Sequence, residues 1–316
     1  MSSRFVWRRV AWAVVQLFTL AAVVFLGTAA LSGDAAVALL GPDYDPVKAA
    51  RLRSQLHLDE PLGDRFWHWL SGLCRGDLGR SLVSGEPVSH VIESGVASTV
   101  ILTLATIVVA VPLALSVGLA AGVRADGILD RTLTTVSVGL YAIPDFVLAL
   151  LLVAVVSLKL HLLPPTALGS DAGTLLRTPA LLVLPVVVLS CQCVTSVSRQ
   201  VRAGVIDTLE HPYVLHAARS GLPRWRVLLC HVAPGALAPA VQNLARVVNS
   251  LVGGVLVVET IFAIPGLASA LVTAVAARDV PVVQGITVLL GAAALAVNLG
   301  SDLLVVRLRP RSALAR

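Results

Sequence analysis

The chain has 316 residues, of which 57% are hydrophobic and only 13% are charged, and its mean hydropathy is +0.88. That is far more apolar surface than one soluble core of this length needs to bury, so a soluble globular protein is excluded. The net charge of +6 does not indicate nucleic-acid binding, because the basic residues are divided among the flanks of apolar segments. The composition predicts a polytopic membrane protein.

Six apolar segments have about the 20 residues that a helix needs to cross a hydrocarbon layer of roughly 30 Å. They are residues 10–31, 98–123, 133–158, 179–197, 236–258 and 282–306. The first follows three arginines, as a signal peptide would, but its apolar run exceeds the about 7 to 15 residues of a signal-peptide core. We therefore expect an all-α protein with six transmembrane helices, the first of which is an anchor.

The placement of arginine predicts the orientation, because cytoplasmic loops near membrane ends carry the basic excess. Arg4, Arg8 and Arg9 precede the first span, and Arg307 and Arg309 follow the last. The long loop at 32–97 instead holds nine aspartate and glutamate residues. We expect both termini in the cytoplasm and this loop on the opposite side.

Within that loop, residues 46–56 predict an amphipathic helix, and residues 64–73 predict a second short helix with Phe66, Trp67 and Trp69. The aromatic residues fit either of two interpretations. They pack against neighbouring helices as a cap, which is the simpler interpretation, or they lie at the membrane interface. The glycine-punctuated turn at 76–81 that follows is not a phosphate loop, because no lysine follows its glycines.

A polar, arginine-bearing island at 211–234 stands between two apolar segments. Pro212 is suited to the first position of a helix and Gly221 to its left-handed end, so residues 212–220 predict a short helix. Pro223 predicts the start of a second helix that runs to residue 232 and is stopped by Pro234. Two short helices outside the bilayer make a knob that fits a partner's groove, although basic amphipathic helices also lie on anionic lipid.

The island and several further blocks resemble, in sequence and in order, the permeases of ABC importers of the dipeptide, oligopeptide and nickel branch. In the island the matching residues are Tyr213, Val214, Ala217, Gly221, Leu222, Arg226 to Leu229 and His231. The other blocks are residues 58–62, 76–81, 143–148, 163–166, 259–262, 265–267 and 278–285. Together they cover nearly the whole chain, and the long loop after the first span resembles the first of the two permease subunits in such systems.

The resemblance implies the type I ABC importer permease fold in a bacterial inner membrane. That fold has six transmembrane helices, a long extracytoplasmic loop after helix 1, and a cytoplasmic coupling helix between helices 4 and 5. It divides this chain into an N-terminal segment with the first transmembrane helix (1–31), an extracytoplasmic loop subdomain (32–97) and a permease core (98–316) that contains the coupling segment at 211–234.

The function that the resemblance implies is import of di- or oligopeptides along a path that this subunit helps to form. The alternative cargo for the same architecture is nickel or a metal chelate. The implied partners are a second permease subunit in a heterodimer, two cytoplasmic ABC ATPase subunits, an extracytoplasmic solute-binding protein and the lipid bilayer. The chain itself is then a transport subunit without catalytic residues or a cofactor, and ATP and Mg bind to the ATPase partners.

The residues that the resemblance assigns to ATPase coupling are Tyr213, Ala217, Ala218, Gly221, Leu222, Arg224 and Arg226. Small side chains at 217 and 218 would permit close approach to an ATPase groove, and Gly221 would allow the turn. We expect Gly221→Pro or Ala217→Asp to abolish uptake while membrane insertion stays intact. Leu215 and His216 depart from the family pattern, which has glutamate and alanine there.

Candidates for the translocation path lie in the fifth span, where Gln242, Arg246 and Asn249 share one helix face. A charge at bilayer depth costs at least about 2 to 3 kcal/mol on insertion scales, so Arg246 needs an explanation. It either meets a peptide carboxylate or extends toward the cytoplasmic surface. Asp145, directly after Pro144, belongs to a kink or a gate.

Catalytic chemistry is not indicated, since there is no Walker motif, no His-Glu-x-x-His and no serine or cysteine constellation with a base. The seven histidines are scattered and the four cysteines have no histidine near them in sequence, so no metal site is indicated. An ion-gradient-driven secondary transporter is the remaining class. It predicts inverted repeats and buried ion-binding groups, and the sequence has no convincing repeat.

Overall fold

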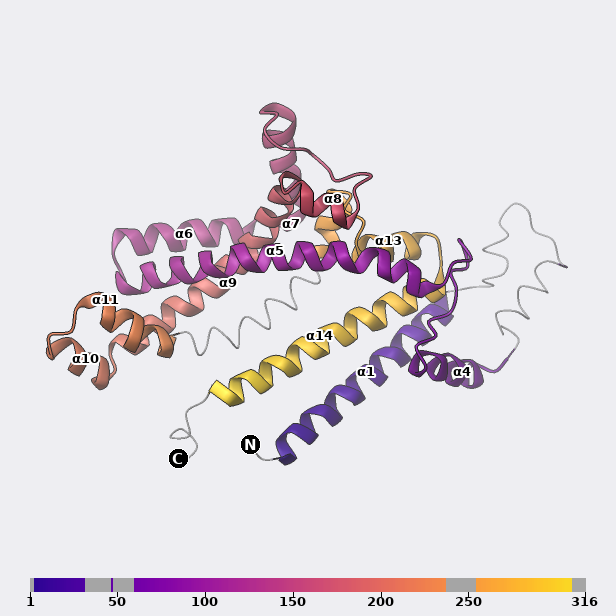
Figure 1. Ribbon diagram of the computed structural model, residues 1–316, viewed down its shortest axis with the longest axis horizontal. Helices are drawn as coiled ribbons and strands as arrows, with labels where there is room; N and C mark the ends of the chain where they lie inside the picture. Colours follow the sequence, from indigo (N-terminus) through magenta and orange to yellow (C-terminus); the bar gives the residue numbers. More distant parts are fainter. Residues whose placement is uncertain (1–2, 32–46, 48–59, 237–253, 309–316) are drawn as a thin grey trace. The chain divides into compact units, whose positions relative to one another are not determined.

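The computed structural model describes residues 3–31, 47, 60–236 and 254–308 (Figure 1). Every regular element in these ranges is a helix, and the one β contact within them is an isolated bridge between Arg80 and Pro87. Four of the helices are long and apolar enough to cross a membrane, and a bent pair makes up to five. The prediction of an all-helical polytopic protein is confirmed. The count of six stays a prediction, because residues 237–253 of the fifth predicted span, like most of the predicted helix at 46–56, lie outside the described residues.

Four predicted spans correspond to single helices, namely α1 (Ser3–Leu31), α5 (Val88–Val123), α9 (Ala180–Leu209) and α14 (Val280–Leu308). α5 begins before its predicted apolar segment and α9 continues well past its own. Hydropathy locates only the part of a helix that fits the hydrocarbon layer, whereas the backbone hydrogen bonds continue as long as no residue breaks them. The polar C-terminal part of α9, residues 198–209, therefore extends beyond the predicted span as a helical arm.

The third predicted span, residues 133–158, is not one helix. It consists of α6 (Ile128–Ala142), then α7 (Asp145–Leu152) with the π-helical turn η2 (Val153–Lys159), and the two parts are bent by 97°. The physical reason is Pro144, which disfavours the helical conformation at the residue before it. Ile143 is accordingly extended, with φ −83° and ψ 122°. The bent pair is compatible with one broken span or with a re-entrant loop, so the third span stays a prediction, and the prediction of a kink beside Asp145 is confirmed.

By contacts in space the chain forms two compact units, which are described separately below. The first comprises residues 100–264 and 296–316, and the second comprises residues 2–99 and 265–295. The three-part organisation expected along the sequence stays a prediction, because this division follows contacts in space.

In the first unit, helices α5 and α9 form the main core. The buried residues of this core are Ala110, Ala114, Cys193, Val197, Val201, Val205, Val214, Val227, Val232 and Ala236. Those from α5 are alanines and those from α9 recur every fourth residue, so each set forms one stripe along its helix. α6 also packs on α9, where the Thr195 hydroxyl donates to the Ser137 carbonyl at 2.9 Å.

The same unit contains the segment after η2, which includes the short helix α8 (Ala172–Arg177). Asp171 caps this helix by accepting a hydrogen bond from the Thr174 backbone N–H at 2.8 Å. The Thr174 hydroxyl also donates to this carboxylate and, with the backbone bond, holds the pKa of Asp171 below its usual value. The Ala167 N–H donates to the Phe262 carbonyl at 2.7 Å, which ties this segment to the end of the helix at residues 254–261.

The second unit is built from α1, α4 (Leu62–Cys74), the start of α5, α13 (Leu267–Ala276) and the start of α14. Its buried core consists of Val88, Ile92, Leu267, Ala274, Val282 and Ile286. α13 approaches α5 closely because Gly95 has no side chain, and a Cβ there would lie 3.0 Å from the backbone of Gly266. α1 is joined to α14 by a hydrogen bond of 2.7 Å from the Gln284 side-chain amide to the Thr28 hydroxyl.

Candidate functional site

The island at 211–234, called the knob from here on, forms two short helices joined by a tight turn at the end of α9 (Figure 1). α10 (Pro212–Arg219) starts after an extended His211, and its proline occupies the first turn, where a missing N–H costs nothing. Gly221 has φ +80°, a left-handed conformation that reverses the chain. Pro223 then precedes α11 (Arg224–Val227). The predicted helix–turn–helix is therefore confirmed.

The second helix differs from prediction at its end. α11 continues as the π-helical turn η3 (Leu228–Val232), and residues 233–236 are still helical. The expectation that Pro234 stops the helix is wrong. The wider π turn shifts the hydrogen-bond pattern immediately before Pro234. The proline therefore lies where the α-helical hydrogen bonds begin again, and its missing N–H is tolerated there.

The inner face of the knob is apolar and buried against the first unit's core. Val214, Ala217 and Val227 are 2%, 6% and 7% exposed, and Val232 is fully buried. The Tyr213 hydroxyl donates to the His231 carbonyl at 3.3 Å, which holds α10 against η3. The knob is consequently a packed extension of α9 with a fixed geometry.

The outer face carries large apolar side chains beside arginines. Trp225 and Leu229 are 63% and 61% exposed, and Tyr213 and Leu215 are about half exposed. Arg219, Arg224 and Arg226 are exposed as well. Exposed aromatic and arginine residues together are typical of the residues that dominate protein–protein interfaces.

The predicted coupling residues divide between these two faces. Ala218, Gly221, Arg224 and Arg226 are exposed, Tyr213 is half-exposed and Leu222 is partly buried. Ala217 points into the core, so its small size serves packing within this chain and its side chain does not face a partner's groove. Sequence reasoning left Leu215 out of the predicted site, although it precedes the exposed Arg219 by one helical turn.

The base of the knob is fixed by a close crossing of α5 and α9. A Cβ at Gly118 would lie 2.6 Å from the Val201 Cβ, and a Cβ at Gly122 would lie 2.7 Å from the Val205 Cβ. Real Cβ atoms do not approach so closely, so only glycine allows the two helices to meet here. Two glycines four residues apart are a recurrent contact in membrane helix pairs, and this is the sequence signal that could have located the crossing.

An ion pair joins α9 to α6 on the same arm. The Arg202 Nε donates to Asp130 Oδ1 at 2.6 Å and its Nη2 donates to Asp130 Oδ2 at 2.7 Å. Asp130 is 3% exposed at the side chain, and it also accepts a bond from the Asp126 N–H at 2.9 Å. A bidentate pair of this kind fixes orientation as well as distance. The pair therefore fixes the orientation of α9 relative to α6 at this point.

A polar contact lies at the break between α6 and α7. The Gln192 side-chain amide of α9 donates to Asp145 Oδ1 at 3.0 Å. The other carboxylate oxygen would be 3.5 Å from a Cβ at Gly254. Asp145 thus lies at the kink, within reach of α9 and of the chain at residue 254. The predicted path residues Gln242, Arg246 and Asn249 lie outside the described residues.

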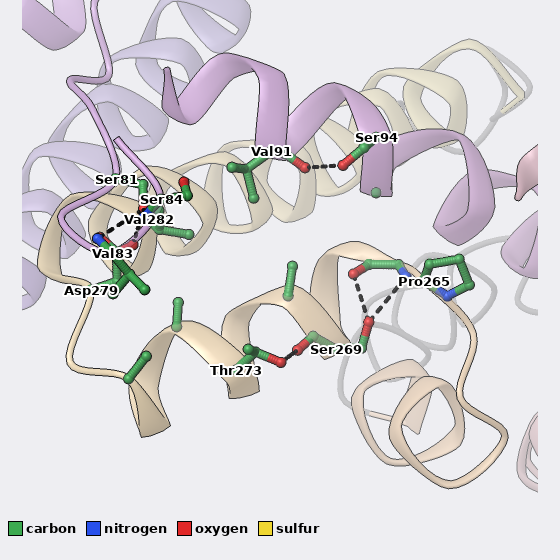
Figure 2. A pocket seen from close by; sticks show the side chains of 15 residues that line it. Ser81, Val83, Ser84, Val91, Ser94, Pro265, Ser269, Thr273, Asp279 and Val282 are labelled. Carbon is green, nitrogen blue, oxygen red and sulfur yellow. Dashed lines mark hydrogen bonds between the residues drawn. The ribbon is translucent and has the colours of Figure 1, made fainter. Parts of the chain in front are cut away.

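A hollow of about 340 Å³ occurs in the second unit, between the loop at 81–84, the start of α5 and α13 (Figure 2). The buried Asp279 carboxylate accepts from the Ser81 hydroxyl and, at 3.0 Å, from the Leu82 N–H, which holds the loop in place. Hydroxyl groups in the lining, such as those of Ser94 and Thr273, donate to carbonyls of their own helices. The hollow therefore offers small, satisfied groups, and we assign no ligand to it. No group of three potential metal ligands occurs among the described residues.

These features define a helical membrane protein in which one spanning helix continues into a packed knob with an exposed outer face. Residues 110–313 match the family described as binding-protein-dependent transport system inner membrane component. Residues 2–116 match the corresponding N-terminal membrane component. The chain therefore belongs to this family, as a permease subunit of an ABC importer of the peptide and nickel type. Members of the family are transport components of multi-pass inner-membrane systems and are not enzymes.

Individual relatives agree with this membership. The chain is 33% identical over 306 residues to the Glutathione transport system permease protein GsiC of Escherichia coli strain K12, and the match covers 97% of both chains. The proteins of the same name from Escherichia coli O6:H1 strain CFT073 and Salmonella choleraesuis strain SC-B67 match with the same identity and coverage. The resemblance inferred from the motifs is thus confirmed over almost the whole length.

Proposed function

We propose that this chain is one of two different permease subunits of an ATP-driven importer whose cargo is a peptide delivered by a solute-binding protein. In this proposal the chain has six transmembrane helices, both termini and the knob face the cytoplasm, and residues 32–97 face outside. Two ATPase subunits bind ATP and Mg, and the chain holds no cofactor. The arginine excess at both ends of the chain and beside the knob supports the orientation.

The observation that carries the proposal is the two-faced knob. Its inner valines belong to the same core as α9, whereas Trp225, Leu215 and the arginines are left uncovered. A surface helix that only lay on lipid would not need a rigid attachment to a spanning helix. A helix that transmits force needs both a rigid base and an exposed contact face.

The described contacts suggest how movement passes from the knob into the membrane. When the ATPase subunits close, they displace the knob, and α9 follows because the knob's inner face packs on it. The Asp130–Arg202 pair carries this displacement to α6, which ends at the break before Pro144. Helices that move as packed bodies about such a break provide a rigid-body gating change.

The cargo class is the finer part of the proposal. The relatives named above are glutathione permeases, and glutathione is itself a small peptide. Peptides, including glutathione, are therefore the class that we propose, with nickel or a metal chelate as the alternative. The test is uptake by the complete transporter in vesicles, with labelled dipeptide, glutathione and nickel compared side by side. Uptake of nickel without either peptide would contradict the peptide proposal.

The coupling role is tested on the outer face, where substitution does not disturb the core. We expect Trp225→Ala to weaken recovery of the ATPase subunits with the permease about tenfold, as expected for an exposed aromatic anchor of an interface. The matched control is Leu168→Ala, since Leu168 is 82% exposed and lies outside the knob. Equal recovery of the ATPase subunits with both variants would refute docking through this face. Ala217→Asp is a poor test, because it places a charge in the core.

A further inference from the structure

Helix α4 lies against α1 through a cluster of aromatic rings. The Phe66 ring centroid is 5.9 Å from that of Phe18 and 5.3 Å from that of Phe25. The Trp69 ring lies 5.6 Å from Phe25. Such edge-to-face and tilted pairs stabilise a contact beyond the area that they bury. α4 is therefore attached along the C-terminal half of α1, as Figure 1 also shows.

The position of this contact along α1 sets its depth in a membrane. The apolar span of α1 is Trp7–Ala30, so Phe18 and Phe25 lie twelve and five residues before its end. At about 1.5 Å per residue they are roughly 18 Å and 8 Å from that end. A span of this length exceeds a hydrocarbon layer of roughly 30 Å by only a few ångströms. Phe66, which contacts both rings, consequently lies level with the acyl chains.

The side chains of α4 that α1 leaves exposed include both apolar and polar groups. Trp67 is 61% exposed and Leu62 is 53% exposed, although the Trp67 ring adjoins Phe66 at 5.6 Å. Asp64 and Ser71 are exposed on the same helix. Tryptophan prefers the boundary between headgroups and acyl chains, where its ring is in an apolar environment and its N–H reaches polar groups.

We propose that α4 is an interfacial helix that lies in the lipid–water boundary at the C-terminal end of α1, with Trp67 and Leu62 in contact with bilayer lipid. Lipid is the occupant that the structure favours, because only 11% of the most apolar window of α1 is buried within the chain. Acyl chains are the default surroundings of such a span. The aromatic contacts hold α4 at that depth, so the same lipid reaches its exposed apolar side chains. In the orientation proposed above, this is the extracytoplasmic leaflet.

The charge of α4 makes the interaction independent of anionic lipid. The helix carries one aspartate and one arginine, Asp64 and Arg65, and has no basic cluster. Attraction to anionic headgroups requires several basic residues near the surface. The interaction therefore depends on the aromatic and aliphatic area, and neutral phosphatidylcholine is a sufficient partner.

The test uses the full chain with Trp67 as its single tryptophan, after Trp7, Trp12, Trp69 and Trp225 are each replaced by phenylalanine. It is reconstituted in phosphatidylcholine vesicles whose acyl chains carry bromine near the top, the middle or the bottom. We expect fluorescence to fall about twofold with the top-brominated lipid and less with the others. The variant that keeps only Trp12, which lies within the α1 span, is the control for quenching at another depth.

Three results would overturn the proposal. Emission characteristic of water with no quenching would place α4 outside the bilayer, and strongest quenching from the bottom of the chains would place it too deep. Quenching that disappears when the second permease subunit is reconstituted with the chain would show that a protein covers this face. If the single-tryptophan variants do not fold, Trp67→Cys in a background in which Cys74, Cys191, Cys193 and Cys230 are each replaced by serine gives the same readout with a polarity-sensitive label and leaves the other tryptophans in place.

Discussion

The most apolar 18-residue stretches of α9 and α1 have the same mean hydropathy, 2.2, yet the two stretches are buried to very different extents within the chain. In α9, 56% of that stretch is buried within the structure, compared with 11% in α1. Hydropathy therefore shows that both helices can enter a membrane, but it does not show what surrounds them there. That difference depends on the pattern of residues around each helix.

The pattern of α9 matches a partner within the chain. Its valines at 201 and 205 face Gly118 and Gly122 of α5, so two backbones come together without a gap. Among the described residues, α1 contacts its neighbours through the aromatic cluster with α4, the Thr28–Gln284 hydrogen bond, and the packing of Leu20 on Gly291. Membrane helices associate through close packing rather than through a hydrophobic driving force. α9 is therefore the helix on which the rest of its unit packs, and most of the apolar surface of α1 is left for contact with lipid or with other subunits.

The largest expected effect is at the crossing of α5 and α9. Gly118→Val places two methyl groups where a single Cβ already meets Val201 and the Ser198 carbonyl oxygen, at 2.6 Å and 2.7 Å. We expect the free energy of unfolding to fall by about 3 kcal/mol or more, which is the upper end of the usual cost of overpacking. Most of the folded protein is then lost. Thermal unfolding of the purified permease in detergent measures this.

The control for that prediction is Gly27→Val in α1, because no atom lies within 4 Å of a Cβ at Gly27. We expect this variant to unfold at the wild-type temperature. If the two valines lowered stability equally, the contrast between α9 and α1 would be wrong.

The next effect concerns the ion pair that joins α9 to α6. Asp130→Arg or Arg202→Asp brings two like charges together at a site where the Asp130 side chain is 3% exposed, and we expect uptake to fall by at least about tenfold. The double variant with the charges exchanged restores an attractive pair and recovers part of the uptake. Uptake is measured per folded permease, together with ATP hydrolysis by the complete transporter. Failure of the exchange to improve on either single variant would contradict a transmitting role for the pair.

A smaller effect on folding, but a large one on function, is expected at Gly221. Proline fixes φ near −65°, which is incompatible with the observed φ of +80°. Because nothing lies within 4 Å of a Cβ there, Gly221→Pro disrupts the turn of the knob and leaves the α5–α9 crossing intact. We expect normal membrane insertion without uptake. Gly221→Asn is the control, since asparagine tolerates the left-handed conformation and should retain most of the uptake.

Features set by neighbours in the sequence could be predicted, and features set by packing could not. The turn at Gly221 and the break before Pro144 follow from the backbone preferences of one or two residues. The burial of Ala217 depends on α9, and the Asp130–Arg202 pair joins residues that are 72 positions apart. Neither could be obtained from local pattern, because the sequence around each residue is equally compatible with exposure. The spacing of Gly118 and Gly122 indicates a close helix contact from sequence alone, but it does not show which helix packs there.

The smallest expected effect is the sharpest comparison, because it makes one chemical change in both helices. Val201→Leu adds a methylene to a fully buried side chain that faces Gly118 and should cost about 1 to 3 kcal/mol. Val23→Leu adds the same group to a side chain that is 61% exposed on α1 and should change stability by less than about 0.5 kcal/mol. Both are measured as unfolding of the isolated chain in detergent. A loss at Val23 as large as that at Val201 would mean that α1 is already packed against protein in the isolated chain, most simply against a second copy. If Val23→Leu is silent in the isolated chain but weakens recovery of the second permease subunit, the open face of α1 is the surface on which that subunit binds.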